Sequence, residues 1–142
     1  MMPHGFSNSE AAGEFTQTLN GGLSEAGYSE TQAAFQGSSV TGVGFRSGLP
    51  FGDHSDYDIA LGGDDLFNAA KEAGIGLRSG GTRTGPLNPA QLEQLGLSEM
   101  QAQLEGMAGR EVHFMVYQSI EGAVGRSPSM LVPPNEELGG LE

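Results

Sequence analysis

Glycine divides this chain into short segments, and that division limits the folds the chain can adopt. The 24 glycines among 142 residues are about twice the usual share, and they gather in clusters instead of recurring with a fixed period. The clusters are Gly21-Gly22, 37–52, Gly62-Gly63 and 74–85. Each cluster stands next to a segment with helix or strand signals, so we expect loops of one α/β domain spanning residues 1–142.

Size and charge exclude several classes of protein. A chain of this length can bury most of its apolar surface without metal or disulfide staples, and it contains no cysteine. It has no apolar run of the roughly 18 residues that a membrane span needs, so we expect a soluble protein with no membrane partner. The net charge of -12 disfavours a long nucleic-acid footprint, because phosphate contacts dominate such binding. A basic partner, or a small anion held in a local pocket, remains compatible with the composition.

Capping signals and apolar spacing predict four helices. Ser7 and Glu10 form a possible capping box for a helix over residues 8–20, which Gly21-Gly22 would end. The other three are expected from Asp64 or Asp65 to Gly74, from Asn88 to Gly96, and onward from a capping box of Ser98 and Gln101. We expect all of them to pack on one side of a sheet.

Three segments have the composition of strands: residues 31–36, 57–61 and 112–117. In the second, alternation places Tyr57, Ile59 and Leu61 on one face and Asp56, Asp58 and Ala60 on the other. These strands predict a small mixed sheet of the α/β (α+β) class. Residues 1–7 and 128–142 are expected to be irregular or flexible, the latter because the tail is rich in proline.

The segment from Gly37 to Asp58 has the residue types of a metal and phosphate site. Asp56 and Asp58 stand one residue apart on a strand, so both carboxylates can share a hard cation such as Mg²⁺. Gly37 lets the backbone approach a phosphate closely, and the hydroxyls of Ser38 and Ser39 can donate to its oxygens. The alternative is that the two aspartates flank an ordinary turn and that the glycine only bends the chain.

These residues resemble the nucleotidyltransferase superfamily, which includes DNA polymerase beta and the minimal nucleotidyltransferases. The similar parts are AFQGSSVTG at 34–42 and SDYDIA at 55–60, with a looser match over 110–117. With RSGGTRTGPL at 78–87, they are most similar to nucleotidyltransferase-type domains at the C-termini of bacterial polymorphic secreted toxins.

The resemblance implies a reaction and a set of partners. Gly37 and Ser38 would hold the β- and γ-phosphates of a nucleoside triphosphate, and Asp56 and Asp58 would bind catalytic Mg²⁺. An acceptor hydroxyl on a protein, an RNA end or a small molecule would attack the α-phosphorus. The resemblance to toxins implies a domain secreted within a larger protein, acting in the cytoplasm of a target cell and inhibited by a cognate immunity protein.

The third acidic residue of the family pattern is replaced. His113 occupies its place, and Glu111 has the same strand parity, so either side chain could face the aspartate pair. Imidazole suits Mn²⁺ or Zn²⁺ better than Mg²⁺, and it could instead act as a general base. A third interpretation is a strand histidine that is hydrogen-bonded to a backbone carbonyl.

Three arginines are candidate nucleotide ligands. Arg46 lies in a spacer longer than is usual for the family, and Arg78 and Arg83 lie in a glycine-threonine loop between helical segments. Guanidinium groups suit triphosphate oxygens, although solvated surface arginines would have the same pattern. A different class of function also remains open: a nucleotide-binding or protein-interaction module that keeps the fold without turnover.

Overall fold

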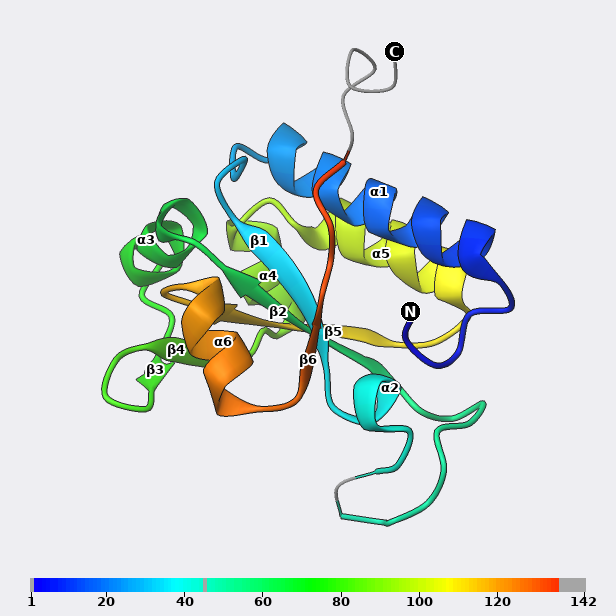
Figure 1. Ribbon diagram of the computed structural model, residues 1–142. Helices are drawn as coiled ribbons and strands as arrows, with labels where there is room; N and C mark the ends of the chain where they lie inside the picture. Colours follow the sequence, from blue (N-terminus) through cyan, green and yellow to red (C-terminus); the bar gives the residue numbers. More distant parts are fainter. Residues whose placement is uncertain (1, 45, 136–142) are drawn as a thin grey trace.

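One six-stranded sheet organises residues 2–44 and 46–135, which are those described by the computed structural model (Figure 1). The strands are β1 (Gln32–Gln36), β2 (Tyr57–Gly62), β3 (Leu77–Arg78), β4 (Arg83–Pro86), β5 (Val112–Tyr117) and β6 (Ser129–Leu131). The helices are α1 (Ser9–Glu25), α2 (Ser38–Thr41), α3 (Asp64–Glu72), α4 (Pro89–Gln94), α5 (Ser98–Ala108) and α6 (Ile120–Arg126).

The sheet is mixed, with strand order β3-β4-β5-β2-β1-β6. β2 and β5 are parallel neighbours in its centre, and the other pairs are antiparallel. The predicted α/β class with a small mixed sheet is therefore confirmed. So are the strands expected at 31–36, 57–61 and 112–117, and the helices expected from Asp64 or Asp65, from Asn88 and from Ser98. The N-cap of α3 is Gly63, so the expected cap at Asp64 or Asp65 is wrong.

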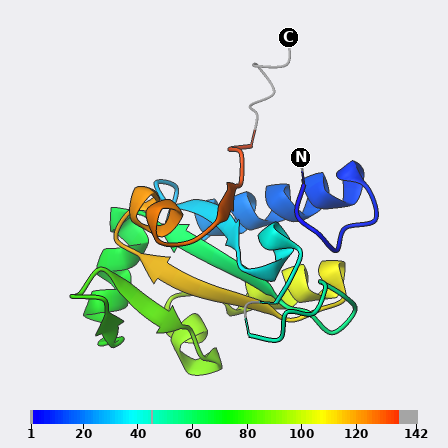
Figure 2. The same cartoon turned by 60° about the horizontal axis from the view of Figure 1, so that its bottom comes forward.

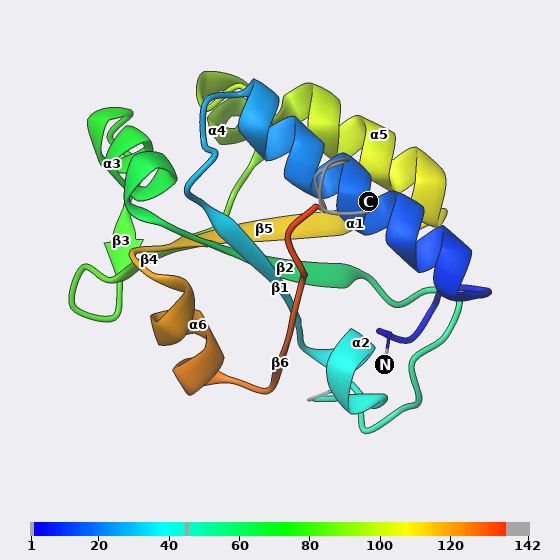
Figure 3. The same ribbon diagram turned by 45° about the horizontal axis from the view of Figure 1, so that its top comes forward.

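The alternation of β2 divides the core into two layers. Tyr57, Ile59 and Leu61 belong to the large cluster that also contains side chains of α1, α3, α4 and α5. Ala60 lies on the other face, in a smaller cluster with Ile120 of α6. Figure 3 shows α1 and α5 side by side, with α6 across the strands from them. The four expected helices therefore do pack on one side, while α6, a helix that was not predicted, covers the second face.

Helix α1 continues through Gly21-Gly22 to Glu25, so the predicted end of this helix is wrong. A Cβ at Gly22 would lie 2.6 Å from Met100 Cγ, so the glycine allows α1 and α5 to approach closely. This tertiary packing outweighs the weak helix propensity of glycine. The N-cap is Asn8, whose side chain accepts from the Ala11 N–H at 2.9 Å, in place of the expected Ser7 box.

The capping box expected at Ser98 is also absent. Leu97 occupies the N-cap position of α5 and makes no side-chain capping bond. Gln101 is used elsewhere, because its Nε2 donates to the Val112 carbonyl at 3.1 Å. The helix start therefore contributes to the attachment of β5.

Residues 78–83 form a β-hairpin, not the expected loop between helices. Arg78 pairs with Arg83 in the antiparallel β3–β4 ladder. Figure 2 shows this hairpin at the opposite end of the sheet from α2 and the following loop, which leads to β2. That separation matters for the arginines predicted to bind nucleotide.

The termini are more ordered than expected. Residues 2–7 contain no helix or strand, yet the ring of Phe6 stacks on that of Tyr57 with centroids 5.0 Å apart. The tail forms β6, which pairs with β1, and the expectation of an irregular segment is wrong there. Residues 132–135 contain no helix or strand, as expected, and the part of the expectation for 136–142 lies outside the described residues. None of the helices in the described ranges is both long and apolar enough to cross a membrane.

Candidate functional site

The parallel pairing of β2 with β5 brings the acidic segments together. Neighbouring parallel strands begin at the same edge of a sheet, so the residues just before them are neighbours. Asp56 precedes β2 and Glu111 precedes β5, and the Tyr57 N–H donates to the Glu111 carbonyl at 3.0 Å. One step along the strands, Asp58 is the register partner of His113.

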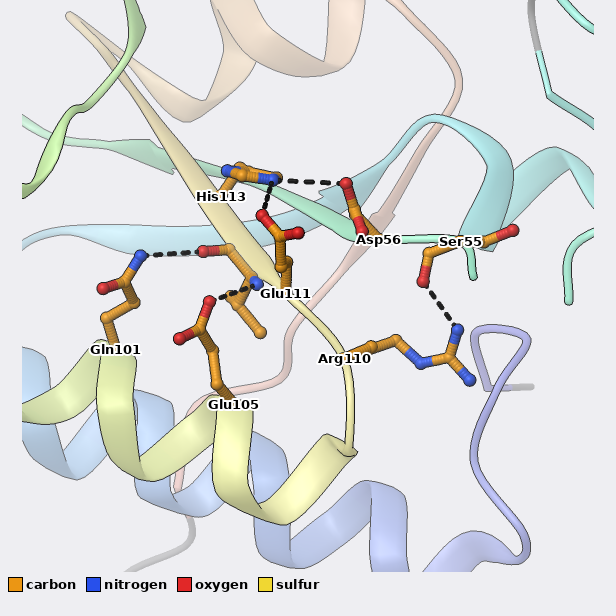
Figure 4. A network of polar contacts seen from close by, with 8 residues as sticks. Ser55, Asp56, Gln101, Glu105, Arg110, Glu111 and His113 are labelled. Atoms are coloured by element: carbon orange, nitrogen blue, oxygen red, sulfur yellow. Dashed lines mark hydrogen bonds and ion pairs between the residues drawn. The ribbon is translucent and has the colours of Figure 1, made fainter. Parts of the chain in front are cut away.

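Three side chains converge at this edge (Figure 4). His113 Nε2 lies 3.3 Å from Asp56 Oδ2 and 3.4 Å from Glu111 Oε1. Within the described ranges, Asp56, Glu111 and His113 form the group whose ligand atoms all lie within 4.8 Å of one another. The structure thus brings both alternatives for the third position, Glu111 and His113, to Asp56.

Asp58 lies beside this group, next to the glycine turn. A Cβ built on Gly37 would be 3.0 Å from Asp58 Oδ2. Desolvation raises the pKa of the Asp58 carboxyl, while nearby His113 lowers it and nearby Asp56 raises it. Asp58 is still exposed to solvent, so the desolvation is partial. The carboxylate is held in an environment that disfavours its negative charge.

The turn after β1 depends on the backbone freedom of glycine. Gly37 has φ of +72°, in the region that favours glycine, and begins the short helix α2. Ser38 is half-buried beside it. The fully buried Ser39 donates its hydroxyl to the Gln36 carbonyl at 3.3 Å, so this group supports the turn and is not presented to a phosphate.

Arg110 anchors the loop that leads to Asp56. Its NH1 donates to the carbonyls of Gly52 and Ser55 at 2.9 and 2.7 Å. Its guanidinium also lies over the ring of Phe51, 4.6 Å from the centroid, and 5.2 Å from that of Tyr57. The sequence reasoning missed this role. The sequence feature that could have indicated it is the position of this arginine directly before Glu111, within the segment 110–117 of looser resemblance.

Helix α5 fixes the other strand of the site. Glu105 Oε2 accepts from the Val112 N–H at 3.0 Å, and Gln101 holds the Val112 carbonyl (Figure 4). Both backbone groups of the residue between Glu111 and His113 are therefore bound by side chains of one helix. This attachment, which the sequence did not reveal, sets the position of Glu111 and His113.

The predicted nucleotide-binding arginines are not brought to the cluster. Arg46 is exposed in the loop between α2 and β2. Arg78 is exposed on the hairpin, where its guanidinium lies against Gly85. Arg83 is buried and pairs with Tyr117, four residues along β5 from His113. At roughly 3.3 Å per residue this is about 13 Å along the strand.

Comparison with protein families, curated proteins and solved structures gives no match for this chain.

The donor set fits a divalent cation. Two carboxylates and one imidazole supply three donor atoms at a spacing that one ion could bridge. Oxygen donors suit Mg²⁺, and the added nitrogen donor favours Mn²⁺ or Zn²⁺. Since a cation would also offset the repulsion between carboxylates, the electrostatics of the cluster agree with its donor chemistry.

Proposed function

We propose that this chain is a metal-dependent nucleotidyltransferase, which moves a nucleoside monophosphate from a nucleoside triphosphate to an acceptor hydroxyl. The observation that carries the proposal is the convergence of Asp56, Glu111 and His113 beside the turn at Gly37. The turn and the aspartates are the segments in which the sequence resembles the nucleotidyltransferase superfamily.

The glycine turn would bind the triphosphate. Gly37 has no side chain, and its positive φ turns the chain sharply between β1 and α2. A phosphate can approach such backbone closely, and the Ser38 hydroxyl can donate to its oxygens. Asp58 lies against the same turn, so the phosphates would enter between a hydrogen-bonding backbone and the carboxylates.

The remaining groups would carry out the transfer. A divalent cation held by Asp56, Glu111 and His113 would supply positive charge next to the leaving phosphates. The acceptor oxygen would form a bond to the α-phosphorus while the bond from this phosphorus to the α–β bridging oxygen breaks, releasing pyrophosphate. The hydroxyl proton would pass to the Asp58 carboxylate, which lies outside the three-donor group. The resemblance instead gives Asp58 to the metal.

The resemblance also supports a biological setting. We propose that the domain is a toxin module secreted within a larger bacterial protein and acting in the cytoplasm of a target cell. Its acceptor would be a hydroxyl on a protein, an RNA end or a small molecule. A cognate immunity protein would cover the surface of the site between Gly37 and Asp58. Because the chain has a net charge of -12, we expect that protein's contact face to be rich in arginine and lysine.

The test is a transfer assay with α-labelled nucleoside triphosphates, Mg²⁺ or Mn²⁺, and a cell extract as the source of acceptors. We expect metal-dependent label transfer with release of pyrophosphate, and a loss of at least about 100-fold in Asp56→Asn. Asp53→Asn is the matched control, because it removes the same charge from an exposed position three residues away. If no triphosphate, metal or acceptor gives turnover, the proposal fails in favour of a binding module without catalysis.

A further inference from the structure

A polar pocket lies far from the acidic cluster, between the β3–β4 hairpin, the end of β5 and helix α6. Its volume is about 390 Å³. Polar residues dominate its lining, among them Thr82, Arg83, Tyr117, Gln118, Ser119 and Arg126. In Figure 1 the hairpin and α6 are adjacent at the opposite end of the sheet from α2. The lining contains two guanidinium groups and no carboxylate.

Arg83 has a buried positive charge, although the chain as a whole has a net charge of -12. Only 9% of its surface is exposed, and its guanidinium donates to Ser79 Oγ at 3.1 Å and to the Thr84 carbonyl at 3.2 Å. Among the ion pairs within residues 2–44 and 46–135, none joins it to a carboxylate. Buried charges are normally paired, because neutral acceptors compensate poorly for lost hydration. A bound anion would supply the missing negative charge.

Arg126 brings a second cation to the same pocket. Its NH1 donates to the Tyr117 hydroxyl at 3.0 Å, which holds the guanidinium over the end of β5. Since Tyr117 is the register partner of Arg83, the two arginines approach the pocket from neighbouring elements. The side chain of Arg126 is otherwise exposed, so its charge is accessible from solvent.

Helix α6 leaves room between these groups. Ser119, Gly122 and Arg126 have the spacing of one helix face, and all three line the pocket. A Cβ at Gly122 would meet only Ser119 Oγ, at 3.3 Å. The central position of the face therefore has no side chain to fill the space between the guanidinium groups.

We propose that this pocket binds the phosphate group of a small phosphorylated molecule. Guanidinium groups present paired N–H donors that match the oxygens of a phosphate, and two of them balance a dianion. The hydroxyls of Ser79 and Thr82 add short polar groups to the lining. Tyr117, which lines the pocket, is about 13 Å along β5 from His113, and no residue of the acidic cluster lines the pocket, so phosphate binding there does not rest on the proposed transfer.

Titration of the protein with inorganic phosphate, followed by amide NMR shifts, tests the proposal. We expect saturable shifts at Thr82, Ser119 and Gly122, and weaker shifts with acetate at equal ionic strength. Arg126→Gln should weaken phosphate binding at least about tenfold, while Arg46→Gln, which removes the same charge from the distant loop, should change it less than about twofold. Equal weakening in the two variants would overturn the proposal, since it would indicate only a general charge effect.

A second pair of variants tests whether phosphate binding needs the open volume of the pocket, as the first pair tests whether it needs the charge of Arg126. Gly122→Leu should fill the pocket and reduce phosphate affinity at least about tenfold. Gly125→Leu is the matched control: it makes the same change in the same helix at a position where nothing lies within 4 Å of the added Cβ. Retained binding in Gly122→Leu, or no saturable phosphate binding by the parent protein, would contradict the proposed pocket. Saturable binding that persists in Asp56→Asn would support its independence from the acidic cluster.

Discussion

Replacement of Arg110 by methionine should have two effects: it should destabilise the protein, and it should displace Asp56. The guanidinium is the link between the start of β5 and the loop that leads into β2. Methionine keeps a flexible apolar stem of similar reach, so the change removes the charge and the hydrogen bonds more than the packing. No acceptor within the described ranges contacts Arg110 Nε, so losing that buried donor should cost nothing.

The magnitude follows from the contacts. Two hydrogen bonds to carbonyls contribute about 1 kcal/mol each, and the two contacts with aromatic rings about 0.5–1 kcal/mol each. We therefore expect a loss of about 3–4 kcal/mol in the free energy of unfolding, a large part of the roughly 5–15 kcal/mol typical of a domain.

Urea unfolding at neutral pH, followed by circular dichroism, measures this loss. Arg46→Met is the control: it removes the same charge from an exposed loop residue and should change stability by less than about 0.5 kcal/mol. The folded Arg110→Met protein should also bind Mn²⁺ more weakly than the parent. A loss no larger than that of Arg46→Met, with unchanged Mn²⁺ affinity, would refute the anchoring role.

Three further changes test the surroundings of the site. Asp58→Asn should stabilise the protein at pH 7 while abolishing transfer. The pKa of the Asp58 carboxyl is raised in the folded state, so the parent protein loses stability as the pH rises from the unfolded-state pKa near 3.8 through the folded-state pKa. Urea unfolding at several pH values should show this loss in the parent protein and not in the variant. Gly37→Ala should cost more stability than Gly48→Ala in thermal unfolding, because both have positive φ but only the Cβ at Gly37 meets Asp58. Burial raises the pKa of Tyr57 to about 12, and this effect exceeds the lowering by the charge of Arg110. A late tyrosine ionisation should therefore appear in an ultraviolet titration of the parent protein and be absent in Tyr57→Phe. The stability of the parent protein should fall as the pH rises from 10 to about 12.

Local patterns were sufficient for the central strands and most helices. The alternation in 57–61 assigned Tyr57, Ile59 and Leu61 to the main core, because burial on one face of a strand follows directly from its period of two. The end of α1 could not be obtained this way. Glycine normally weakens a helix, and only contact with Met100 of α5 reveals why Gly22 lies inside one.

The site was predictable as a set of acidic neighbours but not as a geometry. The order of residues indicated that Asp56 and Asp58 precede or begin a strand, and that Glu111 or His113 would face them. The parallel pairing of β2 with β5 is a long-range contact, and it decides that both Glu111 and His113 reach Asp56. For the same reason, the hairpin that takes Arg83 away from the cluster had no local signal beyond its glycines.

The most direct test of the central claim is Mn²⁺ binding, measured by the loss of the free-ion signal in electron paramagnetic resonance. We predict one Mn²⁺ site in the parent protein and at least about tenfold weaker binding in Asp56→Asn, Glu111→Gln and His113→Ala, with Asp53→Asn unchanged. His113→Asp should shift the preference toward Mg²⁺, because an oxygen donor replaces the nitrogen. Parental affinity in all three cluster variants, or no Mn²⁺ site in the parent protein, would contradict a metal centre at these residues.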